Sequence, residues 1–68
     1  MANNKQKIKE KHYLIKTICY GTTREWQTRE EAERFFIECM CHSEGSEKER
    51  YLKILYKLKS GFIVCDDN

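Results

Sequence analysis

The sequence predicts a two-layer α+β domain of order β-β-α-α-β, in which a small three-stranded antiparallel sheet packs on a helical hairpin. Two segments repeat their apolar residues with the spacing of an amphipathic helix. Three short segments rich in β-branched, aromatic and aliphatic residues flank them. Because neither three short strands nor two short helices are stable alone in water, we expect both layers to share one hydrophobic core.

Composition narrows the class of protein further. The chain has 68 residues, of which 40% are hydrophobic and 35% charged, and its formal net charge is +2. This length excludes a multidomain enzyme, and the apolar content argues against disorder. No apolar run approaches the roughly 20 residues that a bilayer requires, and the first residues do not have the apolar stretch of a secretory signal. We therefore expect a cytoplasmic protein whose four cysteines are free thiols.

The chain divides into an arm and a domain. Residues 1–11 carry four lysines and one glutamate, with Ile8 as the side chain to bury, and we expect them to form a flexible arm. Such an arm either keeps the domain in solution or binds nucleic acid or another acidic surface. Residues 12–68 are expected to form the single small domain.

The domain is expected to open with a β-hairpin. His12–Tyr20 is rich in aromatic and β-branched residues and predicts the first strand. A turn is expected at Gly21 and Thr22, followed by a second strand over Thr23–Gln27 with Trp26 as its anchor. The turn has no Asn-Gly pair, which is the strongest sequence signal for a tight hairpin.

The first helix has the most specific local signal in the chain. Thr28 and Glu31 have the spacing of a capping box, in which each side chain bonds the other's backbone amide. An apolar face follows at the i, i+3, i+4, i+7 and i+8 positions: Ala32, Phe35, Phe36, Cys39 and Met40. The segment from His42 to Gly45 interrupts this pattern and is expected to be a loop.

The second helix and the last strand follow. Ser46 and Glu49 have the spacing of a second capping box, and Gly61 is placed to end the helix in a left-handed turn. Phe62–Cys65 is expected to be a short strand and Asp66–Asn68 a solvated tail. We favour pairing of this strand beside the first, although the sequence does not fix the order of the strands. The predicted core consists of Trp26, Phe35, Phe36, Cys39, Leu52, Leu55, Leu58 and Ile63.

One cluster has residue types that ligate metals. Cys39, Cys41 and His42 would suit zinc, and a small structural zinc-binding domain is an alternative to a metal-free fold. The C-x-C-H spacing departs from the usual pair of C-x2-4-C knuckles, and Cys39 also fits the apolar face of its helix. We expect no cofactor. We also expect no catalytic residues, because neither histidine has an orienting partner and so small a core leaves little room for a pocket.

A basic helix makes nucleic-acid binding the main alternative function. The second helix carries five basic residues, which the arm would supplement: Lys48, Arg50, Lys53, Lys57 and Lys59. Acids at the start of the same helix, such as Glu47 and Glu49, oppose this function. No sequence motif of a known nucleic-acid-binding module is present, and a basic helix is more often a solvated face.

Two stretches carry a resemblance to a group of known proteins. Glu44–Tyr51, followed by Ile54, Leu58, Gly61 and Cys65-Asp66, is one; Ile15–Gly21 with Arg24–Trp26 is the other. Over residues 12–67 the chain resembles small uncharacterised accessory proteins of conjugative transposons and phages of Gram-positive bacteria. The resemblance implies no catalytic residue and no cofactor. It implies a binder of a host or element protein.

We therefore expect a non-enzymatic protein-interaction module, one variety of which is an inhibitor of a host defence nuclease, of the anti-CRISPR kind. A sheet edge or an exposed aromatic surface would dock on the partner. Aromatic residues dominate the binding energy of interfaces, so the expected anchors are Tyr20, Trp26, Tyr56 and Phe62. Homodimerisation through the same surface is a close variant.

Overall fold

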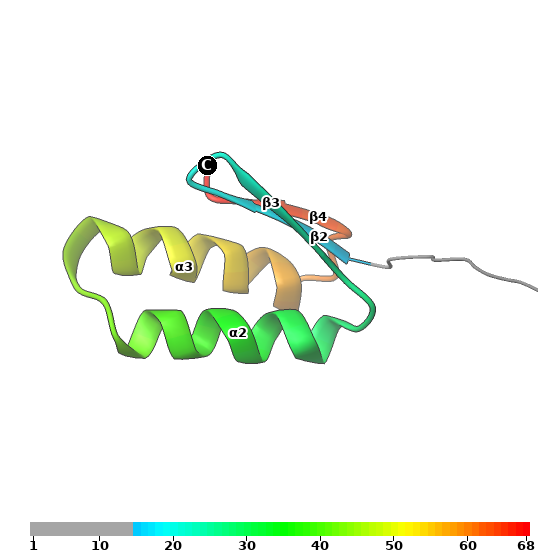
Figure 1. Ribbon diagram of the computed structural model, residues 1–68, viewed down its shortest axis with the longest axis horizontal. Coiled ribbons are helices and arrows are strands. Elements are labelled where there is room, and N and C mark those ends of the chain that lie inside the picture. Colours follow the sequence, from blue (N-terminus) through cyan, green and yellow to red (C-terminus); the bar gives the residue numbers. More distant parts are fainter. Residues whose placement is uncertain (1–14) are drawn as a thin grey trace, which may run out of the picture.

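The computed structural model describes residues 15–68. The lysine-rich residues 1–11 and the predicted strand start at residues 12–14 lie outside this range. The elements in chain order are β2 (Ile15–Cys19), β3 (Thr22–Trp26), α2 (Arg29–Cys41), α3 (Gly45–Lys59) and β4 (Val64–Asp66). The predicted order β-β-α-α-β is confirmed, and the helical hairpin lies against one face of the sheet (Figure 1).

The hairpin turns one residue earlier than predicted. Tyr20 and Gly21 form its two-residue loop, and both have positive φ angles, 53° and 75°. Two successive left-handed residues define a type I′ turn, whose twist matches that of the flanking strands. Thr22 therefore belongs to β3 and pairs with Cys19, and Trp26 pairs with Ile15 at the other end.

The sheet is mixed, so the prediction of an antiparallel sheet is wrong in one strand. Its order is β3-β2-β4, with β4 beside β2 as predicted, but β4 runs parallel to β2. Two antiparallel helices return the chain to the end of the sheet where β3 finished, which is the end where β2 starts. At that end, the Arg29 guanidinium links the start of α2 to the end of α3. It donates to the carbonyls of Leu58 (2.7 Å) and Phe62 (2.8 Å).

Of the two predicted helix starts, one is confirmed. The Thr28 hydroxyl accepts a hydrogen bond from the Glu31 amide at 3.1 Å and caps α2. In contrast, α3 begins at Gly45, and its N-cap Glu44 makes no side-chain capping bond. Ser46 therefore lies inside the helix, where it cannot act as the cap.

The predicted helix end at Gly61 is confirmed. Gly61 has a φ of 95°, which favours glycine. Its amide donates to the Leu58 carbonyl at 3.2 Å, and the Phe62 amide donates to the Lys57 carbonyl at 3.0 Å. These are the two bonds of a Schellman motif, which satisfies carbonyls that the helix end leaves without partners.

The core lies between the sheet and the two helices. Its buried hydrophobic side chains are Ile15, Ala32, Phe36, Ile54, Leu55, Leu58 and Cys65. Of the predicted core, Phe36, Leu55 and Leu58 are buried, Trp26 and Phe35 are partly buried and pack against the core, and Cys39 is partly buried.

Two predicted core residues are exposed, namely Leu52 at 45% and Ile63 at 63%. Ile54 and Leu58 define the buried side of α3, which leaves Leu52 about 160° away from Ile54. Ile63 lies in the bend before β4, so the strand alternation that buries Cys65 does not extend to it. Within residues 15–68, no helix has both the length and the apolar character needed to cross a bilayer.

Phe36 tests this packing, because its ring is 1% exposed and contacts Trp26, Phe35 and Tyr51. We expect Phe36→Ala to lower the free energy of unfolding by about 3–5 kcal/mol through loss of burial and creation of a cavity. Urea denaturation measures this change. The matched control is Phe62→Ala at a half-exposed ring, and equal losses in both variants would contradict the described core.

Candidate interaction site

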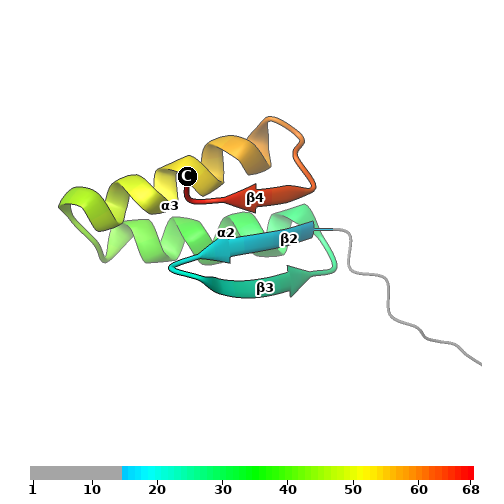
Figure 2. The same ribbon diagram turned by 90° about the horizontal axis from the view of Figure 1, so that it is seen from above.

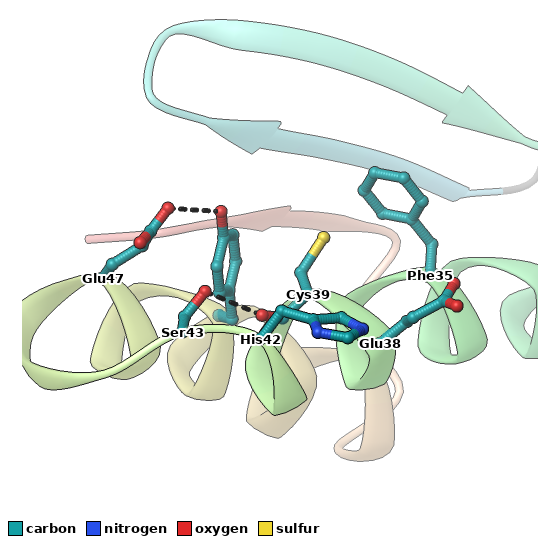
Figure 3. Close-up of a pocket in the computed structure, with 7 residues that line it drawn as sticks. Phe35, Glu38, Cys39, His42, Ser43 and Glu47 are labelled. Atoms are coloured by element: carbon teal, nitrogen blue, oxygen red, sulfur yellow. Dashed lines mark hydrogen bonds between the residues drawn. The ribbon is translucent and has the colours of Figure 1, made fainter.

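A groove lies between the β-hairpin and the loop that joins α2 to α3 (Figure 3). It consists of two adjoining hollows of about 350 and 190 Å³ that share Phe35, Cys39 and Tyr51. We call their combined lining the aromatic groove. The first hollow adds Glu38, His42, Ser43 and Glu47, and the second adds Cys19, Tyr20, Thr22, Arg24 and Phe36.

Helical spacing brings the floor of the groove together. Phe35, Cys39 and His42 recur at i, i+4 and i+7 of α2, so one side of that helix carries all three. From α3, Tyr51 lies alongside, and its hydroxyl donates to the Glu47 carboxylate one turn earlier at 3.1 Å. The Phe35 and Tyr51 rings both contact the buried Phe36 ring, with centroid separations of 5.0 and 6.1 Å. The floor is therefore an extension of the core.

The groove is chemically suited to binding. Burial is the main cause that raises the pKa of the Cys39 thiol, so it is protonated at neutral pH and a weak nucleophile. Burial, together with the bond to Glu47, raises the pKa of Tyr51 to about 12. The Ser43 hydroxyl donates to the Cys39 carbonyl at 2.7 Å and so caps the helix end. These groups offer an apolar floor and neutral polar atoms.

The charged rim of the groove is acidic on balance. The Glu38 and Glu47 carboxylates border the first hollow. The one cation among the residues that line the two hollows is Arg24, whose guanidinium lies 4.7 Å from the centroid of the Phe35 ring. A partner that enters the groove therefore meets two carboxylates and an aromatic surface partly covered by a guanidinium.

Tyr20 stands at the hairpin end of the groove in a strained conformation. Its φ of 53° is in the left-handed region, which a bulky aromatic residue rarely adopts. Its amide donates to the Asp67 carboxylate at 3.0 Å, and the Arg50 guanidinium lies 4.6 Å from its ring centroid. Even so, Tyr20 is 54% exposed. Its surroundings fix the backbone and leave much of the ring to solvent.

The predicted solvated tail is wrong for two of its three residues. Asp66 belongs to β4, where its carboxylate pairs with Lys57. Asp67 is buried and accepts from the Tyr20 amide and from Arg50, the latter at 2.9 Å. The Tyr20 amide is the main cause that lowers the pKa of Asp67, and Arg50 adds to it. Sequence reasoning missed this contact because it joins residues 47 positions apart.

The four predicted anchor residues do not form one surface. Tyr20 follows β2, whereas Phe62 precedes β4 and lies at the opposite end of the sheet. Tyr56 is about 200° around α3 from the buried Ile54, so it faces away from the sheet. Trp26 is half-buried, with its ring against Phe35 and its Nε1 donating to the Thr17 hydroxyl at 3.0 Å. Of the four, only Tyr20 lines the groove.

The predicted basic surface is divided and partly neutralised. Arg50, Lys53 and Lys57 share one side of α3, and Lys48 and Lys59 share another. Three of the five pair with carboxylates of the fold: Arg50 with Asp67, Lys57 with Asp66, and Lys59 with Glu33. The described part of the chain has nine Lys and Arg against ten Asp and Glu, so the basic excess of the whole sequence lies before residue 15.

The cysteine and histidine cluster does not assemble into a metal site. Cys39 and His42 line the groove, but Cys41 is exposed and does not line it. Over residues 15–68, no three side chains of His, Cys, Asp or Glu are arranged to hold a metal ion. All four cysteines are free thiols, as expected.

Comparisons with protein-family models, with curated proteins and with solved structures found no match to this chain.

Asp67 gives a pH-dependent test of the link to the Tyr20 turn. We expect Asp67→Asn to lower the free energy of unfolding at pH 7 by about 1–2 kcal/mol, through loss of charge-assisted hydrogen bonds. Because folding lowers the pKa of Asp67, its contribution is complete above the unfolded value of about 3.9 and is lost as the pH falls through the lower folded value.

The difference in stability between the wild type and Asp67→Asn should therefore shrink as the pH falls below the unfolded value of about 3.9, as measured by urea denaturation across the pH range. The matched control is Glu49→Gln, which removes an exposed carboxylate. A difference between the wild type and Asp67→Asn that does not shrink as the pH falls below about 3.9 would contradict the described bonds.

Proposed function

We propose that this protein is a non-enzymatic interaction module that binds another protein through the aromatic groove, with Tyr20 as its anchor. The single observation that carries the proposal is the exposed Tyr20 ring on a left-handed backbone. Strained residues cluster at functional sites, where the surrounding structure holds them in place. Here the Asp67 carboxylate accepts a hydrogen bond from the Tyr20 amide, and the Arg50 guanidinium packs on the Tyr20 ring.

Magnitudes support a role for Tyr20 in binding over one in stability. A left-handed conformation costs a residue other than glycine about 1–3 kcal/mol. The contact of the Tyr20 ring with the Arg50 guanidinium is a cation–π interaction at an exposed site, which offsets only part of this cost. Asparagine would fill the same position of a type I′ turn with less strain. Stability alone therefore does not account for tyrosine here, whereas a binding surface does, because aromatic residues supply much of the energy of interfaces.

The proposed setting is the cytoplasm of a bacterium that carries a mobile element or phage, and the proposed partner is a host or element protein. Free thiols are consistent with a reducing compartment. An inhibitor of a defence nuclease fits the acidic rim, because nucleases bind phosphate backbones with cationic surfaces that carboxylates complement. The mechanism would be steric, with the groove and its rim covering a surface that the partner needs.

The alternative function, nucleic-acid binding, has weaker support. Within the domain, ion pairs engage three of the five basic residues of α3, and the net charge of residues 15–68 is slightly negative. Duplex binding would then depend on the lysines of residues 1–11. Electrostatic binding by four lysines is weak and strongly dependent on salt.

Tyr20→Asn separates binding from stability. We expect this variant to unfold with a free energy about 0.5–1 kcal/mol higher than that of the wild type, because strain is relieved, and to lose about tenfold or more in affinity for the partner. Urea denaturation measures the first effect. Titration of a host protein captured by the immobilised wild-type chain measures the second, and analytical ultracentrifugation shows whether that partner is a second copy.

The control is Tyr56→Asn, because Tyr56 is 71% exposed and remote from the groove. It should leave partner binding unchanged. If Tyr20→Asn bound the partner as tightly as the wild type, the proposed anchor would be wrong.

A salt titration tests the alternative. We expect the wild type to show no sequence-independent affinity for duplex DNA at 150 mM salt, which is on the order of physiological ionic strength. Fluorescence anisotropy with labelled duplex and single-stranded DNA measures this binding. If DNA bound there and the double variant Lys48→Glu, Lys53→Glu abolished it, α3 would be a nucleic-acid surface and the alternative function would be favoured.

A further inference from the structure

We propose that the outer edge of β3 binds an extended, basic segment of a partner protein by β-strand addition, with part of that segment lying over the aromatic groove. This inference rests on the proposed function. It specifies which element makes the contact and what chemistry the partner presents.

Strand register shows which backbone groups face outward. The Lys16 amide donates to the Ile63 carbonyl at 2.9 Å, so Lys16 bonds toward β4. Bonding directions alternate along a strand, so Ile15, Thr17 and Cys19 bond toward β3. Their partners are Trp26, Arg24 and Thr22. The amides and carbonyls of Thr23 and Glu25 therefore point to the outer edge, and among residues 15–68 no strand pairs with that edge.

β3 also overhangs the helical layer. Viewed from above, β2 lies close to the line of α2, whereas β3 lies to one side of it, away from α3 (Figure 2). The residues Thr22–Glu25 are all exposed. A strand added to this edge would continue the sheet past α2 without meeting another element of residues 15–68.

Charge on the neighbouring side of α2 selects a basic segment. Glu31, Phe35, Glu38 and His42 recur at i, i+4, i+7 and i+11, so they form one stripe along the helix. The contact of Phe35 with Arg24 of β3 places this stripe below the overhang. Glu31 and Glu38 of this stripe lie on the same side of the sheet as Arg24, so two carboxylates accompany one guanidinium there, whereas Glu25, next to Arg24 in β3, faces the opposite side of the sheet. Alternating lysine or arginine side chains would complement the two carboxylates.

The other edge of the sheet is already protected. β4 is three residues long, and the Lys57 ammonium donates to the Asp66 carboxylate and the Asn68 carbonyl beside it. Short strands and lysine side chains at an edge are ordinary protections against unwanted pairing. β3 has five residues and, within the described residues, no such cover.

A second copy of this chain is a poorer occupant than a basic segment. Two β3 strands that pair antiparallel with full overlap place Arg24 opposite Arg24 of the other copy, and a shift by two residues in one direction places Glu25 opposite Glu25. The same shift in the other direction opposes no like charges, but it pairs only three residues of each strand, Thr22–Arg24. Like charges directly opposite destabilise a strand pair. A heterologous basic strand avoids both conflicts.

The test uses the full chain and a synthetic probe peptide, acetyl-Thr-Lys-Val-Lys-Val-Lys-Thr-amide. We expect the peptide to shift the amide NMR signals of Thr23 and Glu25 in a saturable titration. A copy with glutamate in place of lysine should bind about tenfold or more weakly, because it meets the carboxylates of α2. A copy N-methylated at alternate residues keeps the charge but cannot pair, and should also bind about tenfold or more weakly.

Matched variants of the chain locate the site. Glu38→Lys should weaken peptide binding about tenfold, whereas Glu49→Lys, with the same change of charge on α3, should not. Signal shifts centred on α3, or equal binding of the N-methylated peptide, would overturn the proposal. If the variant Lys5→Ser, Lys7→Ser, Lys9→Ser, Lys11→Ser raised the affinity for the peptide about tenfold or more, the chain's own lysines would occupy the edge and the assignment to a partner would be wrong.

The outcome is separable from that of the proposed function. If the peptide fails to bind while Tyr20→Asn still abolishes partner binding, the β3 edge is not the contact and the interaction module remains. If the peptide binds at β3 while Tyr20→Asn leaves partner binding intact, Tyr20 is not the anchor and the edge remains.

Discussion

The buried Asp67 carboxylate is the interaction on which the arrangement of this domain depends. It accepts from the Tyr20 amide in the hairpin turn and from Arg50 on α3, so one side chain joins both layers at the chain end. A small domain buries little apolar surface, and its margin of stability is correspondingly small. One charged group with two hydrogen bonds therefore has a large share in holding the sheet to the helices at this end. At the other end, Arg29 joins the start of α2 to the end of α3 and to the loop before β4.

Local signals in the sequence predicted the local structure well. They did not predict contacts between residues far apart in the chain. The Thr28 cap, the apolar face of α2 and the Gly61 stop depend on residues within a few positions of one another, and all three are confirmed. The direction of β4 depends instead on where a helical hairpin returns the chain, which no residue of β4 encodes.

In the candidate site, too, the sequence predicted what depends on local signals and missed what depends on long-range contacts. Tyr20 was predicted as an anchor because it is aromatic, and it does line the groove. The floor residues Phe35 and Cys39 were predicted as core residues. The apolar face of a helix predicts which side chains turn away from water, but it does not predict whether they are fully buried. Nothing local distinguishes Asp67 from a solvated tail residue, since its partners are Tyr20 and Arg50.

The Tyr20 turn and the outer edge of β3 are adjacent, so that one partner segment could contact both. Tyr20 lies at the end of β3 where the strand begins, so a segment paired with Thr23 and Glu25 would extend toward its ring. Backbone bonds at the edge are indifferent to the partner's sequence, whereas the carboxylates of α2 and the Tyr20 ring are not. Affinity from the edge and selectivity from the groove would then arise from adjacent elements. In the proposed complex, the hydrogen bond from the Tyr20 amide to Asp67 would hold this turn in place before a partner arrives, and such preorganisation lowers the entropy cost of binding.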